Sequence, residues 1–396
     1  MDRIDHNTAP WSAATDLRLA SPHARPDLIV FSHLRWSWVW QRPQHLVVRL
    51  ARRRTVWFVE EPVVDPSIER PVTRFVDAGP VTVVRRHVPG LDRHIGFDAP
   101  EATGLGEEIA ELAGGEVETV WLYTPLALKA ARALAYRTLV FDVMDDLSSF
   151  KGASPDLPRW HGEALSAADV VLTGGRSLQE SVLATRPDAH LFPSGVDGKH
   201  YAEALSRREL PGTPVAGYVG VIDERLDLDL VGAVADLLPE WHFRMVGPVA
   251  KIAEEDLPRR ANVSYPGPMS YEELPATMAT FDVALMPFAH NEATRRISPT
   301  KTLEYLAAGL PVVSTTVPDV VTDYGDIVRF ADDPGAFAGA CVEALGEAHD
   351  RRYHAACRPL LAWHDWDRIA ARIETILESA NRGAAEVSHV AMGRSA

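Results

Sequence analysis

Short runs of β-branched, aromatic and other apolar residues recur along the whole chain, and several are followed by longer amphipathic stretches. Runs with so few polar positions are typical of strands buried on both faces of a parallel sheet. Their alternation with helices predicts an α/β fold with right-handed crossovers. The runs are residues 27–33, 55–60, 81–84, 119–123, 138–142 and 170–173 in the first half, and 215–220, 242–247, 263–265, 283–287, 311–315 and 327–330 in the second.

The two series of strands indicate two similar domains, because 396 residues exceed what one core usually serves. A cluster of Arg, Pro and Gly within residues 201–214 predicts the connection between them. A ligand is expected in the cleft between the domains, at the carboxyl ends of the strands. The expected limits are a tail over 1–25, an N-terminal Rossmann-like domain over 26–205, a C-terminal one over 206–362, an amphipathic helix over 363–381 and a second tail over 382–396.

Composition excludes several classes of protein. A formal net charge of -15 argues against general nucleic-acid binding, which needs a basic surface. Cys341 and Cys357 lack the spacing of metal ligands, so we expect two reduced thiols. No apolar run reaches the roughly 18 to 20 residues that span a bilayer, and residues 1–25 lack the apolar core of a signal peptide. We therefore expect a cytoplasmic protein.

The segment from Ser298 to Glu304 is the most informative stretch. Ser298, Pro299 and Thr300 precede an apolar-periodic run and are suited to the start of a helix. A helix N-terminus attracts phosphate oxygens, and Lys301 in the first turn adds a cation. Glu304 lies on the same face and could accept hydrogen bonds from sugar hydroxyls. An ordinary surface pair between Lys301 and Glu304 is the alternative interpretation of this spacing.

Residues 298–314 resemble the donor-site signature of GT-B glycosyltransferases of the GT4 type. In that family a glutamate before the sequence Ala-x-Gly-x-Pro-Val is implied to hold the donor ribose, and by position it is Glu304. Residues 281–287 resemble the strand that leads to this loop, and 218–225 resemble the Gly-rich strand end that supplies cations to the diphosphate. The resemblance extends from about residue 215 to 328 and implies two Rossmann-like domains with parallel sheets facing across a cleft. It also implies that the last helix crosses back onto the N-terminal domain.

The resemblance implies a donor site with one departure from the family pattern. Arg225 is expected to be the cation for the diphosphate beside Lys301, although it could instead pair with Glu224 or Asp227. Position 296, where the family has a sugar-contacting glutamate, is arginine. That role could pass to Glu292 or to backbone amides of residues 297–300. The full set of expected donor-site residues is Gly220, Arg225, Gly247, Glu292, Ser298, Pro299, Thr300, Lys301 and Glu304.

The N-terminal half carries the expected acceptor site. Its loop at 32–45 combines arginines and histidines with three tryptophans, which could contact a sugar or lipid or fill the core beneath the loop. Three aspartates end the strand at 138–142; Asp145 could act on an acceptor hydroxyl, or the aspartates could cap the next helix. The sequences at 41–45 and 141–146 resemble a bacterial subgroup of transferases for surface polysaccharides. The expected acceptor-site residues are Arg35, Trp36, Gln41, Arg42, His45, Asp142 and Asp146.

The resemblance implies an enzyme that moves a sugar from a nucleotide-diphosphate sugar to a glycan or lipid-linked acceptor in cell-surface polysaccharide synthesis, with retention of configuration. No tightly bound cofactor and no metal are expected, because the correctly spaced pair Asp227 and Asp229 lies inside a predicted helix. A lipid-linked acceptor would add a peripheral contact at the inner face of the membrane. Two alternatives stay open: a sugar-nucleotide epimerase of the same fold, and a degenerate, non-catalytic binding protein.

Overall fold

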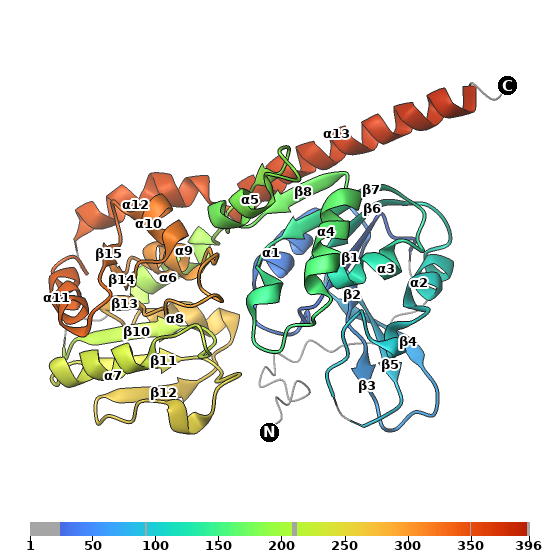
Figure 1. Cartoon of the computed structure of the whole chain (residues 1–396). Coiled ribbons are helices and arrows are strands. Elements are labelled where there is room, and N and C mark those ends of the chain that lie inside the picture. The colour runs from blue at the N-terminus through green and yellow to red at the C-terminus, as the bar shows by residue number, and fades with distance from the viewer. Residues whose placement is uncertain (1–23, 92, 208–211, 349, 394–396) are drawn as a thin grey trace.

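The computed structural model describes residues 24–91, 93–207, 212–348 and 350–393. Two sheets lie side by side, each between layers of helices (Figure 1). This arrangement confirms the predicted α/β class with two Rossmann-like units. The tail expected over 1–25 falls outside the described residues except for its last two positions.

The first sheet has the order β3-β5-β2-β1-β6-β7-β8-β9 within the described residues, with β4 paired to β5. The β4–β5 pair is antiparallel and the others are parallel. Sequence patterning missed β3 and β9, which have two residues each, and β4, whose side chains are mostly not buried. The strands are β1 (Leu28–Ser32), β2 (Val56–Glu60), β3 (Val63–Val64), β4 (Val72–Ala78), β5 (Val81–Val88), β6 (Val117–Leu122), β7 (Tyr136–Val143), β8 (Val170–Thr173) and β9 (His190–Leu191).

The second sheet is parallel throughout and has the order β12-β11-β10-β13-β14-β15 within the described residues. Its order reverses between β10 and β13, so the loops that follow these strands open a crevice at their carboxyl ends. The first sheet has an equivalent reversal between β1 and β6. The strands are β10 (Val215–Val219), β11 (His242–Val246), β12 (Val263–Gly267), β13 (Val283–Met286), β14 (Val312–Ser314) and β15 (Arg329–Phe330).

Helices cover both faces of each sheet. On the first sheet, one face packs against α2, α3 and α4, and the other against α1 and the C-terminal helix α13. On the second sheet, α7 and α11 cover one face, while α6, α8, α9, α10 and α12 pack on the other. The helices of the first half are α1 (Arg42–Leu50), α2 (Leu105–Ala113), α3 (Leu128–Ala131), α4 (Leu157–Ala167) and α5 (Arg176–Val182), with the 3-10 turns Pro100–Ala102, Pro125–Ala127 and Leu147–Ser149.

The connection between the two sheets differs from the expected one. Helix α6 (Gly198–Arg207) occupies part of the predicted linker, and its buried Tyr201 and Ala204 belong to the core of the second sheet. We therefore propose a domain boundary before Gly198, ahead of the expected position at 205. The other helices are α7 (Leu228–Leu237), α8 (Leu274–Met278), α9 (Lys301–Ala307), α10 (Pro318–Tyr324), α11 (Pro334–Leu345), α12 (Arg351–Trp363) and α13 (Trp366–Gly393), with the 3-10 turns Glu254–Asp256 and Tyr271–Glu273.

Helix α13 leaves the second half of the molecule and packs on the first sheet (Figure 1). Trp366 is buried at its start, and Asn381 accepts a 2.6 Å hydrogen bond from the Thr138 hydroxyl in β7. The helix then continues to residue 393, through most of the segment expected to be a tail. Trp363, at the end of α12 just before this helix, is 53% exposed.

Candidate functional site

Two glycines at the carboxyl ends of β10 and β11 allow these two strand ends and the Lys301 side chain to come into close contact. Gly220 ends β10 and Gly247 ends β11, both with φ near +150° (149° and 147°), a region that favours glycine. A Cβ on Gly247 would collide with the Gly220 carbonyl oxygen, and a Cβ on Gly220 would collide with the Lys301 side chain. The glycines therefore let Lys301, at the start of α9, reach the ends of β10 and β11.

Arg225 is held near the carboxyl end of β10 by Asp223, a residue that was not among those predicted from the sequence. Its Nε lies 2.9 and 3.1 Å from the two carboxylate oxygens of Asp223, and its Nη2 lies 2.7 Å from Oδ2. Although burial lowers it, the Asp223 pair raises the pKa of Arg225 overall. The alternative partners Glu224 and Asp227 do not fill this role; the Asp227 side chain caps α7 by accepting from the Leu230 amide at 2.8 Å.

Glu304 and Lys301 are both half-buried at the start of α9, so the two do not form an exposed surface pair. Burial raises the pKa of Glu304, and Lys301 opposes that shift. Burial and the nearby Arg225 lower the pKa of Lys301. Thr300 occupies the predicted N-cap position of α9, but its hydroxyl bonds the Glu304 carboxylate, as does the hydroxyl of Tyr201 from α6. The cation and the carboxylate predicted to share a helix face are therefore held together inside the site.

Asp145, from the first half of the molecule, interacts electrostatically with these cations. It follows β7, and burial raises the pKa of its carboxyl to about 6, although Arg225, Lys251 and Lys301 favour the ionised form. The neighbouring Phe150 ring lies under Lys251 at 4.4 Å and under Arg225 at 5.8 Å. The loop at 145–150 thus faces the carboxyl ends of β10 and β11 from the other half.

Asp146, an expected acceptor ligand, forms an ion pair with Arg296 from the second half. The arginine at the position of the missing family glutamate therefore joins the two halves. Glu292, the suggested replacement for that glutamate, is 74% exposed and pairs weakly with Arg295 at 3.7 Å. The structure does not bring Glu292 to Arg225, Lys301 or Asp145, because its loop points the carboxylate into solvent.

Ser298 lies at the junction of the two halves. A Cβ on Gly175, which precedes α5, would lie 2.8 Å from the Ser298 Cβ. Nearby, the Ser177 amide donates to Asp319 of α10 at 3.1 Å. Pro299 connects Ser298 to the N-cap of α9. The expected donor loop is therefore in contact with the first half of the molecule.

A pocket of about 70 Å³ opens next to the two glycines. One wall is the loop after β1, and the other is formed by the ends of β10 and β11 and the start of α8. Trp40 stacks on Tyr271 across this space, with ring centroids 5.5 Å apart. The lining is mainly apolar and consists of Trp38, Val39, Trp40, Val219, Gly220, Val221, Val246, Gly247, Pro248, Met269, Tyr271 and Leu274.

Arg42 and Asp142 do not face the acceptor side, contrary to expectation. The Arg42 side chain is 2% exposed and that of Asp142 is fully buried. Arg42 Nε binds both Asp142 oxygens, at 2.9 and 3.2 Å, and Nη1 donates to the Phe192 carbonyl at 2.6 Å. The pair connects α1 to β7 inside the first half of the molecule. Each buried charge needs the other as its partner.

Arg35 and Trp36 are likewise bound to their own half. Arg35 donates to the carbonyls of Glu61 and Pro62, and the Trp36 amide donates to buried Glu60 at 2.6 Å. Trp36 packs on Phe58, with ring centroids 5.0 Å apart. Both side chains support the loop after β1, and their direct contact with an acceptor stays a prediction.

His45 is buried and stacks on Trp366 at 5.1 Å, and its pKa is lowered to about 3 by burial. A neutral, enclosed imidazole cannot meet an acceptor, so this prediction is corrected as well. Gln41 precedes α1, where its amide donates to the Gln44 side chain at 3.1 Å. Its own side chain stays a candidate contact at the edge of the loop.

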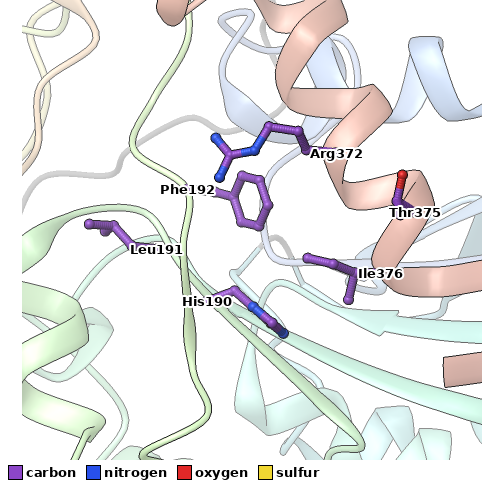
Figure 2. Close-up of a pocket in the computed structure, with 6 residues that line it drawn as sticks. All are labelled: His190, Leu191, Phe192, Arg372, Thr375 and Ile376. Atoms are coloured by element: carbon purple, nitrogen blue, oxygen red, sulfur yellow. The ribbon is translucent and has the colours of Figure 1, made fainter. Parts of the chain in front are cut away.

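A larger pocket, of about 310 Å³, lies between β9 and α13 (Figure 2). Arg372 stacks over the Phe192 ring at 4.8 Å and is the charged side chain in its lining. None of the expected site residues lines it. Its other lining residues are His190, Leu191, Thr375 and Ile376.

The described residues contain no group of three or more His, Cys, Asp or Glu side chains arranged to hold a metal ion. Within the same part of the chain, none of the helices combines the length and apolarity that crossing a membrane requires. The expectations about metal use and about peripheral membrane contact stay predictions.

Comparison with protein families gives a match over residues 213–347, to the family of glycosyl transferases group 1. A relative from Bacillus subtilis (strain 168), TuaH, carries the name of a teichuronic acid biosynthesis glycosyltransferase. It is 29% identical over 213 residues, covering 50% of this chain and 53% of TuaH. The match thus spans about half the length of that relative.

Solved structures resemble the chain over most of its length. Sucrose-phosphate synthase from Thermosynechococcus elongatus has a TM-score of 0.67 at 16% identity, covering 89% of this chain and 98% of its own. The Anabaena protein HepE in complex with UDP has a TM-score of 0.60 at 14% identity, covering 89% and 99%. The chain therefore has the GT-B fold, and its residues 213–347 match the model of the glycosyl transferases group 1 family, in agreement with the resemblance found in the sequence.

Proposed function

We propose that this protein is a glycosyltransferase that moves a sugar from a nucleotide-diphosphate sugar to a glycan or lipid-linked acceptor. The observation that carries the proposal is the convergence of Arg225 and Lys301 at the glycine-rich ends of β10 and β11. Two cations held by a rigid scaffold are suited to a diphosphate leaving group, because they stabilise charge that develops during bond cleavage. The group 1 domain at 213–347 supports the same chemistry.

The reaction breaks the bond between the anomeric carbon and the phosphate oxygen, whose electron pair leaves with the nucleoside diphosphate. The acceptor oxygen forms the new bond to that carbon and loses its proton. Asp145 faces the cations and has a pKa of about 6, so it can take that proton near neutral pH. Glu304, fixed by Tyr201 and Thr300, would accept hydrogen bonds from the ribose hydroxyls. Retention of configuration follows from the family resemblance and is part of the proposal.

The apolar pocket beside Gly220 and Gly247 is suited to a flat base linked to that diphosphate. We favour uridine because the Anabaena neighbour was solved with UDP. The name of the Bacillus relative supports a role in cell-surface polysaccharide synthesis. A location at the inner face of the membrane would follow if the acceptor is lipid-linked.

Calorimetric titration with UDP and GDP, followed by transfer assays with a panel of nucleotide sugars, tests the proposal. We expect micromolar to millimolar binding of one diphosphate and a Glu304→Ala variant with at least about tenfold weaker binding, since a charged hydrogen bond is lost. An unchanged transfer rate in Glu304→Ala would contradict the ribose role. Binding without transfer to any acceptor, but with release and re-addition of the diphosphate, would support the epimerase alternative.

A further inference from the structure

Glu224 lies between β10 and α7, next to Arg225, and has an unusual carboxylate. Its Oε1 lies 3.4 Å from the Lys251 ammonium group. Its Oε2 is buried and has no hydrogen-bond partner among the described residues. A buried carboxylate oxygen without a partner is unfavourable, so such an atom in a native structure calls for a ligand or a water molecule.

Lys251 is held beside Glu224 by the backbone. The Ile222 amide donates to the Pro248 carbonyl at 2.9 Å, and the Ala250 amide donates to the Ile222 carbonyl at 3.0 Å. These bonds join the loop after β10 to the loop after β11. Lys251 has φ of 61°, the one positive value recorded for a non-glycine residue of the described chain. Strained residues of this kind gather at ligand sites, where the surrounding structure holds them in place.

The pair faces the first half of the molecule. The Lys251 ammonium lies 4.4 Å from the ring centroid of Phe150, whose loop also carries Asp145. Glu224 and Lys251 are absent from the lining of the apolar pocket, although Gly247 and Pro248 of the same loop belong to it. A diphosphate at Arg225 and Lys301 would therefore have an apolar pocket and a polar pair as its neighbours.

The apolar pocket and the Glu224–Lys251 pair differ in chemistry, and this difference indicates which part of the donor each would bind. A flat base is suited to the apolar pocket, whereas sugar hydroxyls need acceptors and donors. We propose that Glu224 and Lys251 form the subsite for the transferred sugar, in which the free carboxylate oxygen of Glu224 accepts hydrogen bonds from its hydroxyls. This inference rests on the proposed function, and it gives Glu224 the role that the sequence reading considered for Glu292.

The test compares ligands with and without the sugar. UDP and UDP-glucose, with GDP and GDP-mannose as a second pair, are titrated by calorimetry into wild type and Glu224→Gln. We expect the variant to bind the nucleotide sugar about tenfold to hundredfold more weakly and the diphosphate unchanged within about twofold, since one charged hydrogen bond to the sugar is lost. Glu292→Gln is the matched control, and its affinities should equal those of wild type.

Variants of Lys251 distinguish the role of its charge from that of its backbone conformation. Lys251→Gly removes the ammonium group and accepts the positive φ, so we expect the same selective loss of nucleotide-sugar affinity, with Lys251→Arg near wild type. Equal loss of both ligands in Glu224→Gln, or loss of neither, would overturn the sugar subsite alone. A wild-type protein that binds neither diphosphate would overturn the proposed function, and this inference with it.

Discussion

Arg42 in the first half and Arg225 in the second each donate hydrogen bonds to both carboxylate oxygens of an aspartate, but the surroundings of the two arginines differ. Arg42 is enclosed, and its Nη1 donates to the Phe192 carbonyl. Arg225 stays 26% exposed and faces Phe150 and Asp145. The same ion pair therefore stabilises the fold in one half and presents a cation to the cleft in the other.

The comparison predicts a large loss of stability for Arg42→Met. Removing one partner of a buried pair leaves the Asp142 charge uncompensated, so the free energy of unfolding should fall by about 3–5 kcal/mol. Urea denaturation measures this change.

A double variant, Arg42→Met with Asp142→Leu, serves as the control, because replacing both charges by apolar groups is often neutral. We expect it to recover most of the stability and to keep nucleotide-sugar affinity. If the double variant is stable but loses acceptor binding selectively, the corrected view of this pair is itself wrong.

Lys301→Met tests the opposite half of the comparison. We expect transfer to slow by about 10³-fold, the scale seen when a preorganised stabilising group is removed. The free energy of unfolding should fall by less than it does in Arg42→Met, since Lys301 and Glu304 are only half-buried and Glu304 keeps its hydrogen bonds from Thr300 and Tyr201. Single-turnover transfer and urea denaturation on the same preparation measure the two effects. Lys129→Met, at an exposed position of α3, should change neither; a folding defect in Lys301→Met would place the lysine with Arg42.

Because of Asp145, we expect both the transfer rate and the stability to depend on pH. Its folded pKa of about 6 lies above the ordinary value of 3.8, so the carboxyl is protonated below about pH 6. A base must be ionised, and the transfer rate should therefore fall about tenfold for each pH unit below 6. The same raised pKa means that ionisation opposes folding: the residue costs no stability below pH 3.8, and its cost grows as pH rises towards 6.

Asp145→Asn checks both statements. The transfer rate of this variant should be low and independent of pH between 5 and 7. Its stability relative to wild type should improve as the pH rises from 3.8 towards 6, the range in which the wild-type carboxyl costs stability. Arg225, Lys251, Lys301 and Asp146 are the charges that act on this carboxyl in the structure. A wild-type profile that is flat through pH 6 would remove Asp145 from the proton transfer.

The sequence predicted the parts of this molecule that rest on local patterns. The runs at 215–220 and 283–287 have the composition of buried parallel strands, and Ser298 to Glu304 has the spacing of a helix start. Partners across the fold were out of reach. Nothing local distinguishes Arg42, whose partner is Asp142, from Arg225, whose partner is Asp223. Lys251 did leave a signal, since it follows the end of a predicted parallel strand, where ligand contacts collect.

Arg296 and Asp146 should give the smallest effect, and their pair is where the two halves meet. The two side chains are 34% and 19% exposed, so water screens the attraction and the pair contributes less than about 1 kcal/mol. Arg296→Gln should therefore unfold at nearly the wild-type urea midpoint, and the small difference should vanish in 1 M salt. Transfer should show a KM raised a few fold with kcat unchanged, because the pair holds the halves together without touching the reacting atoms. A loss in kcat comparable with that of Lys301→Met would instead place Arg296 against the transferred sugar and extend the donor site across the cleft.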